Sequence, residues 1–245
     1  MSKLALLFTT LLVVPLSAQA LLLFARGLPH WRDARWDSAG LAPDPATFRG
    51  AVVQIYAARA WGWKGVFAVH SWIAFKREGA AAYERYEVVG WGVKHGLPAV
   101  RRNMRPADAY WAGNRPRLLA DLRGPAAAVL IPRIEAAIAS YPYRRSYRSW
   151  PGPNSNTFVA HLLRSLPELG VELPPEALGK DYLGATRWLA PTPSGTGVQL
   201  SFWGLFGLTL AREEGLELTV LGLNLGIDPL DLALKLPGVG RLALR

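Results

Sequence analysis

Residues 66–75, VFAVHSWIAF, give the strongest strand signal in the chain. Both faces of this strand are largely apolar, so we expect it to lie inside a sheet rather than at an edge. Residues 51–56, AVVQIY, form a second β-rich run. Residues 83–93 follow the turn-like pair Glu78-Gly79 and predict the return strand of an antiparallel hairpin. Together these segments predict a small antiparallel sheet.

Two helices are expected beside this sheet. Pro125 suits the first turn of a helix, and residues 126–140 are helical in composition. Residues 156–166, NTFVAHLLRSL, place apolar side chains on one face at a spacing close to 3.6 residues. Ser155 or Asn156 is a natural N-cap for this second helix. The predicted fold class is therefore α+β, a small antiparallel sheet with packed helices.

The composition excludes several classes of protein. Of the 245 residues, 51% are hydrophobic and 19% are charged, a balance typical of a folded chain rather than a disordered one. The absence of cysteine excludes disulfides, thiolate zinc sites and a cysteine nucleophile. The four histidines lack an HExxH-like spacing, so we expect no metal and no cofactor.

The N-terminal segment has two interpretations. Residues 4–25 carry no charge and would reach about 33 Å as a helix, enough to cross a bilayer. One interpretation is an uncleaved transmembrane helix, and the other is a signal segment cut after the AQA at 18–20. The apolar run continues through residues 21–25, which favours the uncleaved helix. The signal-like start at Lys3 predicts export of the body, although three arginines soon after the segment oppose that orientation.

The remainder divides by composition. Residues 26–50 are rich in proline, glycine and charge and predict an extended stalk. The α+β domain is expected over residues 51–197, with a surface excursion over residues 167–197. Residues 198–245 are rich in leucine and glycine and predict a β-hairpin extension. This extension either covers the core or dips into a membrane interface.

The positive charge is concentrated in one stretch. The net charge is +10, and residues 101–148 contain ten arginines against three acidic residues, with tyrosine and tryptophan interleaved. Arginine forms bidentate contacts with carboxylates and phosphates, so this stretch is either a solvated face or an anion-binding one. For an exported body the acidic partners are lipid head groups and cell-wall polymers. Nucleic acid would require a cytoplasmic body and is not expected.

The candidate site consists of His70 and Ser155. His70 lies in the strongest predicted strand, and Ser155 directly precedes a predicted helix. A serine at a helix N-terminus gains from the positive end of the dipole, and nearby backbone N–H groups can serve as an oxyanion hole. Serine needs a base, and histidine is the usual one. On these residues alone, a helix cap and a structural histidine are the simpler interpretation.

A resemblance strengthens the catalytic interpretation. The hexapeptide NSNTFV at 154–159 resembles the Asn-Cys-x-x-Phe-Val motif of circularly permuted papain-like proteins, which include lecithin retinol acyltransferase-like and NlpC-related groups. In these proteins a strand bearing histidine precedes the nucleophile helix. The resemblance implies a base at His70, a nucleophile position at Ser155, and an orienting group at Tyr86 or Glu87. This sequence departs from the motif of these proteins by having serine in place of cysteine. The difference matters because serine, unlike cysteine, is essentially never ionised at neutral pH.

The chain from about 50 to 240 also resembles a bacterial family, domain of unknown function 3750, with a single N-terminal membrane segment. The pieces that carry this resemblance are GWG at 90–92, PNSNTF at 153–158 and GKDY at 179–182. The resemblance implies a single membrane segment and little about function. Together with the signal-like start, it leads us to expect a location at the bacterial inner membrane with a periplasmic or extracytoplasmic body.

The resulting hypothesis is a cell-envelope protein that acts on, or binds, an acidic cell-wall or lipid-like amide or ester substrate. It would be a Ser/His hydrolase or acyltransferase. The alternative is a non-catalytic membrane-anchored module of the same fold. The expected substrate-binding residues are Asn154, Asn156, Trp72, Arg144, Arg145 and Tyr147.

Overall fold

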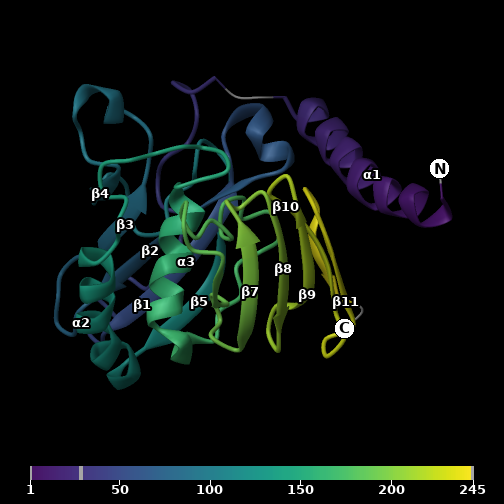
Figure 1. Cartoon of the computed structure of the whole chain (residues 1–245). Helices are drawn as coiled ribbons and strands as arrows, with labels where there is room; N and C mark the ends of the chain where they lie inside the picture. The colour runs from purple at the N-terminus through teal and green to yellow at the C-terminus, as the bar shows by residue number, and fades with distance from the viewer. Residues whose placement is uncertain (1, 28–29, 244–245) are drawn as a thin grey trace.

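The computed structural model describes residues 2–27 and 30–243 (Figure 1). One antiparallel sheet of five strands has the order β4-β3-β2-β1-β5, which confirms the expected small antiparallel sheet. Its two central strands are buried along almost their whole length because both faces of the sheet are covered. The strands are β1 (Val52–Arg59), β2 (Val69–Lys76), β3 (Glu84–Val88), β4 (Val100–Arg102) and β5 (Arg117–Arg123).

Two helices, α2 (Pro125–Ala139) and α3 (Ser155–Ser165), cover one face of this sheet. Their apolar side chains form the main core with Ile55, Ile73 and Phe75 of the central strands. Alternate residues of a strand point to opposite faces, so the residues between these point away from the helices. The predicted α+β arrangement of a sheet with packed helices is present.

The start of α3 differs by one residue from the prediction. Asn154 is the N-cap, and its side-chain oxygen accepts hydrogen bonds from the backbone N–H groups of Asn156 and Thr157. The Thr157 hydroxyl in turn accepts from the Asn154 N–H, which completes a capping box. Ser155 is therefore the first helical residue rather than the cap. The asparagine oxygen at the N-cap accepts from the N–H groups of the second and third helical residues. The Ser155 side chain is therefore available for other contacts.

The second face of the five-stranded sheet is covered by residues that the sequence predicts to be a stalk. Trp36 and Leu41 pack against the buried ring of Trp72 and its neighbour Tyr56. The carboxylate of Asp108 accepts the backbone N–H groups of residues 41 and 42. This segment is therefore part of the folded body, because its few apolar side chains find a sheet face that α2 and α3 leave uncovered.

A second antiparallel sheet of seven strands follows, in the order β12-β11-β10-β9-β8-β7-β6 (Figure 1). The sequence predicts a single hairpin here, but a turn at Trp203-Gly204, where both residues have positive φ, already divides residues 197–211 into two strands. The strands are β6 (Leu189–Pro191), β7 (Gly197–Phe202), β8 (Phe206–Ala211), β9 (Gly215–Val220), β10 (Leu223–Asp228), β11 (Ala233–Leu236) and β12 (Gly240–Ala243).

The two faces of the seven-stranded sheet have opposite polarity. Its inner face, turned to the body, is buried and mostly polar. The inner face comprises Gln199, Ser201, Thr209, Glu217, Thr219, Asn224, Asp228 and Lys235. Its outer face is apolar and partly or fully exposed. The outer face comprises Leu189, Val198, Leu200, Phe202, Phe206, Leu208, Leu210, Leu216, Leu218, Val220, Leu223, Leu225, Ile227, Leu234 and Leu242.

Residues 171–182 join the two sheets. The sequence predicts a surface excursion over 167–197, but much of this segment is buried. Lys180 donates to Glu217 of β9 with an Nζ–Oε2 distance of 2.5 Å, and Asp181 accepts from Gln199 of β7. The polar inner face therefore holds the segment in place by hydrogen bonds and ion pairs.

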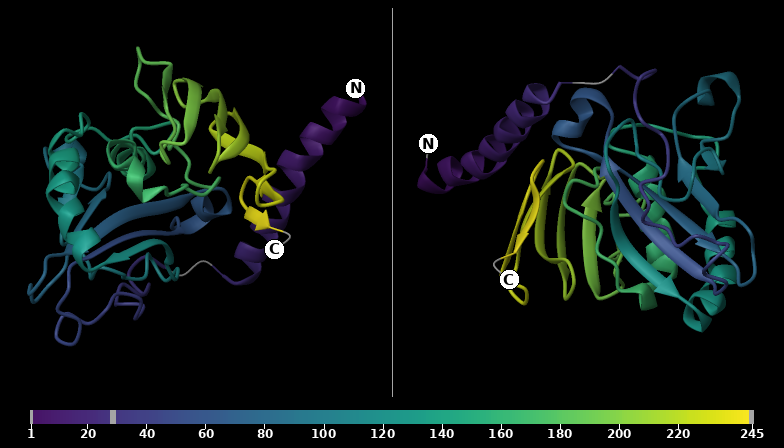
Figure 2. Two further views of the ribbon diagram at one scale, coloured as in Figure 1. Left: turned by 90° about the horizontal axis from the view of Figure 1, so that it is seen from below. Right: turned by 180° about the vertical axis from the view of Figure 1, so that it is seen from behind.

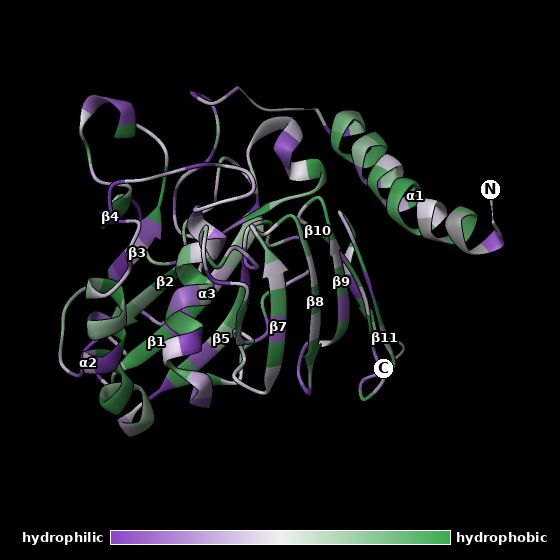
Figure 3. Cartoon of the chain, viewed as in Figure 1, coloured by the Kyte–Doolittle hydropathy of each residue, from purple (hydrophilic) through white to green (hydrophobic). Residues whose placement is uncertain are grey.

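The N-terminal helix α1 (Lys3–Ala25) lies beside the C-terminal strands of the second sheet in both views of Figure 2. Most of it is hydrophobic in Figure 3. Leu16 lies against Gly238, in the turn after β11. Within the described residues 2–27 and 30–243, we find no helix that combines the length and apolarity needed to cross a membrane. The predicted transmembrane helix is therefore not supported.

Candidate functional site

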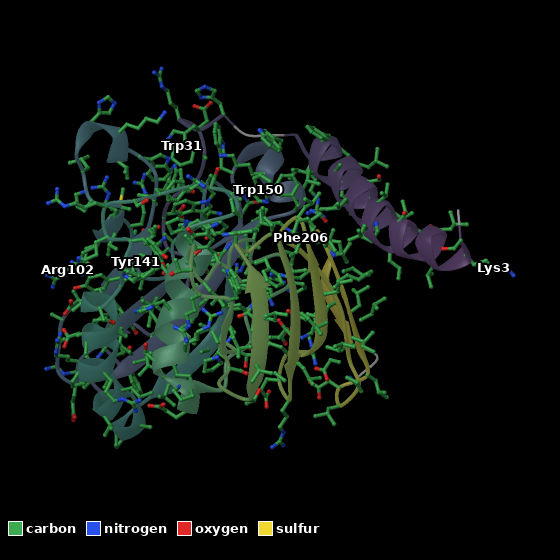
Figure 4. All side chains as sticks on the ribbon, in the orientation of Figure 1. Lys3, Trp31, Arg102, Tyr141, Trp150 and Phe206 are labelled. Atoms are coloured by element: carbon green, nitrogen blue, oxygen red, sulfur yellow. The ribbon has the colours of Figure 1, made fainter. Side chains whose placement is uncertain are left out.

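A cavity of about 430 Å³ opens where one end of β2 meets the N-terminus of α3. His70 and Ser155 both line it, so the structure brings the two expected residues to one site. Eight of the other 21 lining residues are aromatic. These aromatic residues are Trp31, Trp61, Trp63, Phe67, Trp91, Trp111, Tyr147 and Trp150. Figure 4 labels Trp31 and Trp150 at this end of the molecule.

The imidazole of His70 is held by a carboxylate on the next strand. His70 Nε2 lies 2.8 Å from Glu87 Oε2. Glu87 is itself paired with Arg85, whose Nε lies 2.9 Å from Glu87 Oε1. All three side chains are buried. Since a carboxylate accepts but does not donate, Nε2 carries the hydrogen and the lone pair of Nδ1 is available to a reacting group.

Burial and charge set the protonation of this pair. Burial alone would raise the pKa of Glu87, but Arg85 and His70 outweigh it and hold that pKa below its usual value. Burial lowers the pKa of His70 more than the contact with Glu87 raises it. The Glu87 charge is already matched by Arg85, so the imidazole is neutral at pH 7. A neutral imidazole is the form that can take up a proton.

Aromatic rings fix the orientation of the imidazole. The ring of Trp111 stacks on that of His70 with centroids 3.6 Å apart. The ring of Trp91 also stacks on that of Trp111, with centroids 5.4 Å apart, and Trp31 meets Trp91 edge-on at 4.8 Å. This column keeps water from one face of the imidazole, which explains why desolvation dominates its pKa.

Ser155 occupies the positive end of the α3 dipole. The N–H groups of residues 156 and 157 are satisfied by Asn154. Among the described residues, the Ser155 N–H has no hydrogen-bond partner. One backbone donor is therefore available beside the Ser155 hydroxyl, where an oxyanion would need it.

His70 and Ser155 approach the cavity from different sides of β2. Ser71 faces α3, and its hydroxyl donates to Asn156 Oδ1 at 2.8 Å. His70, one residue earlier, projects from the opposite face of the strand beside Trp72. No hydrogen bond joins His70 to Ser155 within the part of the chain that the structure describes.

The two asparagines at the site are structural. Asn154 Nδ2 donates to the carbonyl oxygen of Leu178 at 2.9 Å, and Asn156 Nδ2 donates to that same oxygen at 2.8 Å and to Val69 O at 3.0 Å. Gly179 has φ of +92°, and a Cβ there would lie 2.4 Å from Asn154 Nδ2. The asparagines thus fasten the start of α3 to β2 and to residues 178–179. Both line the cavity, but their amides are already engaged.

The other expected site residues are distributed differently. Tyr147 lines the cavity, whereas Trp72 is fully buried outside it and donates Nε1–H to Ala107 O at 2.7 Å. Arg144 donates to the Ile138 carbonyl at the end of α2, and Arg145 is exposed outside the cavity lining. Tyr86 lies on the helix side of β3, where it stacks on Phe75. Of the two orienting groups considered, Glu87 is the one that contacts His70.

Sequence reasoning missed the tryptophan lining and Arg85. Ten tryptophans in 245 residues, with two of them at 61 and 63, were the available signal for an aromatic site. The alternation of Arg85 and Glu87 on one strand was the signal for a charged pair on one face. In the described chain, we find no group of three or more histidine, aspartate or glutamate side chains arranged to hold a metal.

Comparison with known proteins gives one match. A protein-family model described as "Protein of unknown function (DUF3750)" matches residues 50–182, a span that includes His70, Ser155 and most of the cavity lining. Searches of curated proteins and of solved structures returned no match.

Proposed function

The chain belongs to the DUF3750 family, and we propose that its cavity binds an acyl-chain ester or amide and cleaves or transfers the acyl group through Ser155 and His70. The observation that carries this proposal is the joint presence, in one apolar cavity, of a helix-N-terminal hydroxyl and a carboxylate-oriented neutral imidazole. The residue order is the one implied by the resemblance to permuted papain-like proteins.

The proposed reaction uses the groups described above. The Ser155 oxygen attacks the carbonyl carbon while His70 Nδ1 accepts the hydroxyl proton. The oxyanion formed on the carbonyl accepts a hydrogen bond from the backbone N–H of Ser155. When the bond to the leaving alcohol or amine breaks, His70 returns the proton to it and an acyl-Ser155 ester remains. Water attacks this ester by the same route, or an acceptor alcohol does so in a transfer reaction.

The lining favours a lipid-like substrate over a polymer of sugars. Aromatic and aliphatic side chains dominate the cavity, and Lys64 is the cationic residue at its wall. Such a lining suits a hydrocarbon chain with a polar or anionic end near Lys64. Arg144 and Arg145, which lie outside the cavity lining, have no part in this proposal. The cell envelope, where acyl lipids are concentrated, is the proposed location.

One observation favours a second function, binding without turnover. His70 and Ser155 project from different sides of β2 and share no hydrogen bond in the described structure. For a catalytic site, substrate binding must bring the hydroxyl within reach of Nδ1. If it does not, the same cavity serves as a lipid-binding site.

Labelling with an alkyl fluorophosphonate separates the two functions. We expect the full chain to be labelled and to hydrolyse p-nitrophenyl octanoate, with at least a hundredfold loss in Ser155→Ala and in His70→Gln. Ser149→Ala is the matched control, because Ser149 lines the same cavity but does not begin α3.

Binding is measured in parallel by the quenching of tryptophan fluorescence with octanoate. Quenching without labelling or hydrolysis would overturn the catalytic proposal and support the binding module. Equal labelling of wild type and Ser155→Ala would exclude Ser155 as the nucleophile.

A further inference from the structure

The outer face of the seven-stranded sheet is a continuous apolar surface. Strand register aligns its side chains in rows that run across the sheet. In the middle row, Leu200, Leu208, Leu218 and Leu225 are direct cross-strand neighbours on four consecutive strands. A flanking row aligns Val198, Leu210, Leu216 and Ile227 in the same way, and Phe202, Phe206, Val220 and Leu223 form the third. None of these rows contains a charged residue.

Most leucines of this face are exposed, and within the described chain only α1, which contacts β11, and the ring of Trp188, which contacts Phe202, lie against its border. Four strands about 4.8 Å apart and three rows about 6.8 Å apart give these rows a projected area of about 400 Å². A stable dimer buries about 800 Å² on each partner, so these rows alone are about half of what a second copy would need. A lipid surface has no such threshold of complementary area.

Exposed tryptophans border one edge of the face. Trp188 contacts the ring of Phe202, and Trp203 lies in the turn between β7 and β8. Trp150 donates Nε1–H to the carbonyl oxygen of Leu221, in the turn between β9 and β10, at 2.9 Å. Each of these three tryptophans is 46–51% exposed. Figure 4 shows Trp150 and Phe206 near the same end of the molecule. Tryptophan is the side chain most typical of the boundary between acyl chains and head groups.

Cations lie close in sequence to two of these tryptophans and in the lining of the cavity. Arg187 directly precedes Trp188, Arg148 is two residues before Trp150, and Lys64 lines the cavity. All three are exposed, and among the described residues none forms an ion pair with a carboxylate. Unpaired cations beside an apolar face complement an anionic surface.

We propose that the outer face docks on an anionic phospholipid surface, with the tryptophan edge at the level of the head groups. The cavity opens at this same edge, since Trp150, Leu221 and Leu223 border both. Docking thus places the cavity mouth against the lipid. This proposal stands independently of the chemistry at Ser155.

The test is co-sedimentation of the full chain with vesicles of phosphatidylcholine containing 30% phosphatidylglycerol, or of phosphatidylcholine alone. We expect binding to the anionic vesicles and at least tenfold weaker binding to the neutral ones. Leu208→Lys combined with Leu218→Glu should reduce binding at least tenfold. These positions are directly opposed, so the new side chains form a cross-strand ion pair and the net charge is unchanged.

Leu210→Lys with Leu216→Glu, also directly opposed, is a second variant of the same design. Val129→Glu is the control, because Val129 is 70% exposed on α2, away from the second sheet. Urea unfolding verifies that each variant is folded. Every variant retains α1, so its contribution to binding is constant.

Wild-type binding by both folded double variants would overturn the proposal, as would equal binding to neutral and anionic vesicles. A concentration-dependent dimer in sedimentation velocity, lost in both double variants and without vesicle binding, would assign the face to a second copy instead. Ser155→Ala should bind vesicles as wild type does, so failure of catalysis and failure of docking are distinguishable.

Discussion

In the five-stranded sheet, β2 buries Ile73 and Phe75 against α3, whereas in the seven-stranded sheet β9 buries Glu217 and Thr219 and exposes the leucines on either side. β9 alternates strictly between polar and apolar residues and turns its polar residues to the body of the protein, whereas β2 is buried on both faces. The first sheet follows the usual rule for a water-soluble domain, and the second reverses it.

Ion pairs stabilise the polar face of the second sheet in its buried position. Glu217 contacts Lys180 and Lys235, and Lys235 also pairs with Glu172. Buried charges are tolerated when each has a partner and further hydrogen bonds. The buried polar face therefore needs residues 171–182 as its counterpart, while the apolar outer face is left to meet an apolar environment. The contrast teaches that alternation locates a strand but does not tell which face is inside.

The largest expected effect comes from making the buried face more apolar. Glu217→Leu should destabilise the protein by about 3–5 kcal/mol, because it leaves the buried ammonium groups of Lys180 and Lys235 without this carboxylate. Urea unfolding measures the change. The neighbouring change Leu218→Thr, on the outer face, should cost less than about 1 kcal/mol. If Glu217→Leu proved neutral, the account of the buried ion pairs would be wrong.

A pair of leucine and isoleucine truncations compares the two sheets directly. Ile73 is fully buried, so Ile73→Ala should cost about 2–5 kcal/mol. Leu208 is 48% exposed, and Leu208→Ala should change the free energy of unfolding by no more than about 0.5 kcal/mol. The same urea titration gives both values. Similar costs at the two positions would mean that the outer face is covered in solution.

The smallest effect is in the pH dependence, and its sign differs between the sheets. Burial lowers the pKa of His70 below 6.5, so the unfolded chain binds more protons below that pH. His70 therefore makes stability fall as the pH decreases from about 6.5. Burial raises the pKa of Asp181 and Glu172 beside the second sheet, and these carboxyls act in the opposite direction.

Urea unfolding between pH 5 and 7.5 isolates the histidine. His70→Gln retains an N–H donor for Glu87 but does not titrate, so the loss of stability on acidification should be smaller in this variant. His161→Gln is the control variant, because burial also lowers the pKa of His161. An unchanged pH dependence in His70→Gln would mean that His70 titrates normally.

The local part of the fold was predictable. The apolar runs at 51–56 and 66–75 give β1 and β2, and the periodicity of residues 156–166 gives α3. Histidine on a strand and serine before a helix were also visible, as was the carboxylate two strand positions beyond Arg85. The long-range predictions failed: residues 36–42 cover a sheet face, and residues 171–184 are mostly buried, because their partners lie far away in the sequence.

The sequence by itself determined strands β1, β2 and β3, the two helices beside the first sheet, and the residue types of the candidate site, since these depend on side-chain periodicity and capping within a few residues. Only the tertiary structure decided that Glu87 rather than Tyr86 faces His70, that tryptophans from distant segments line the cavity, and that the second sheet turns its leucines outward. Each of these depends on which face of a strand meets the rest of the chain. The two faces of an alternating strand are equivalent in sequence until a partner covers one of them.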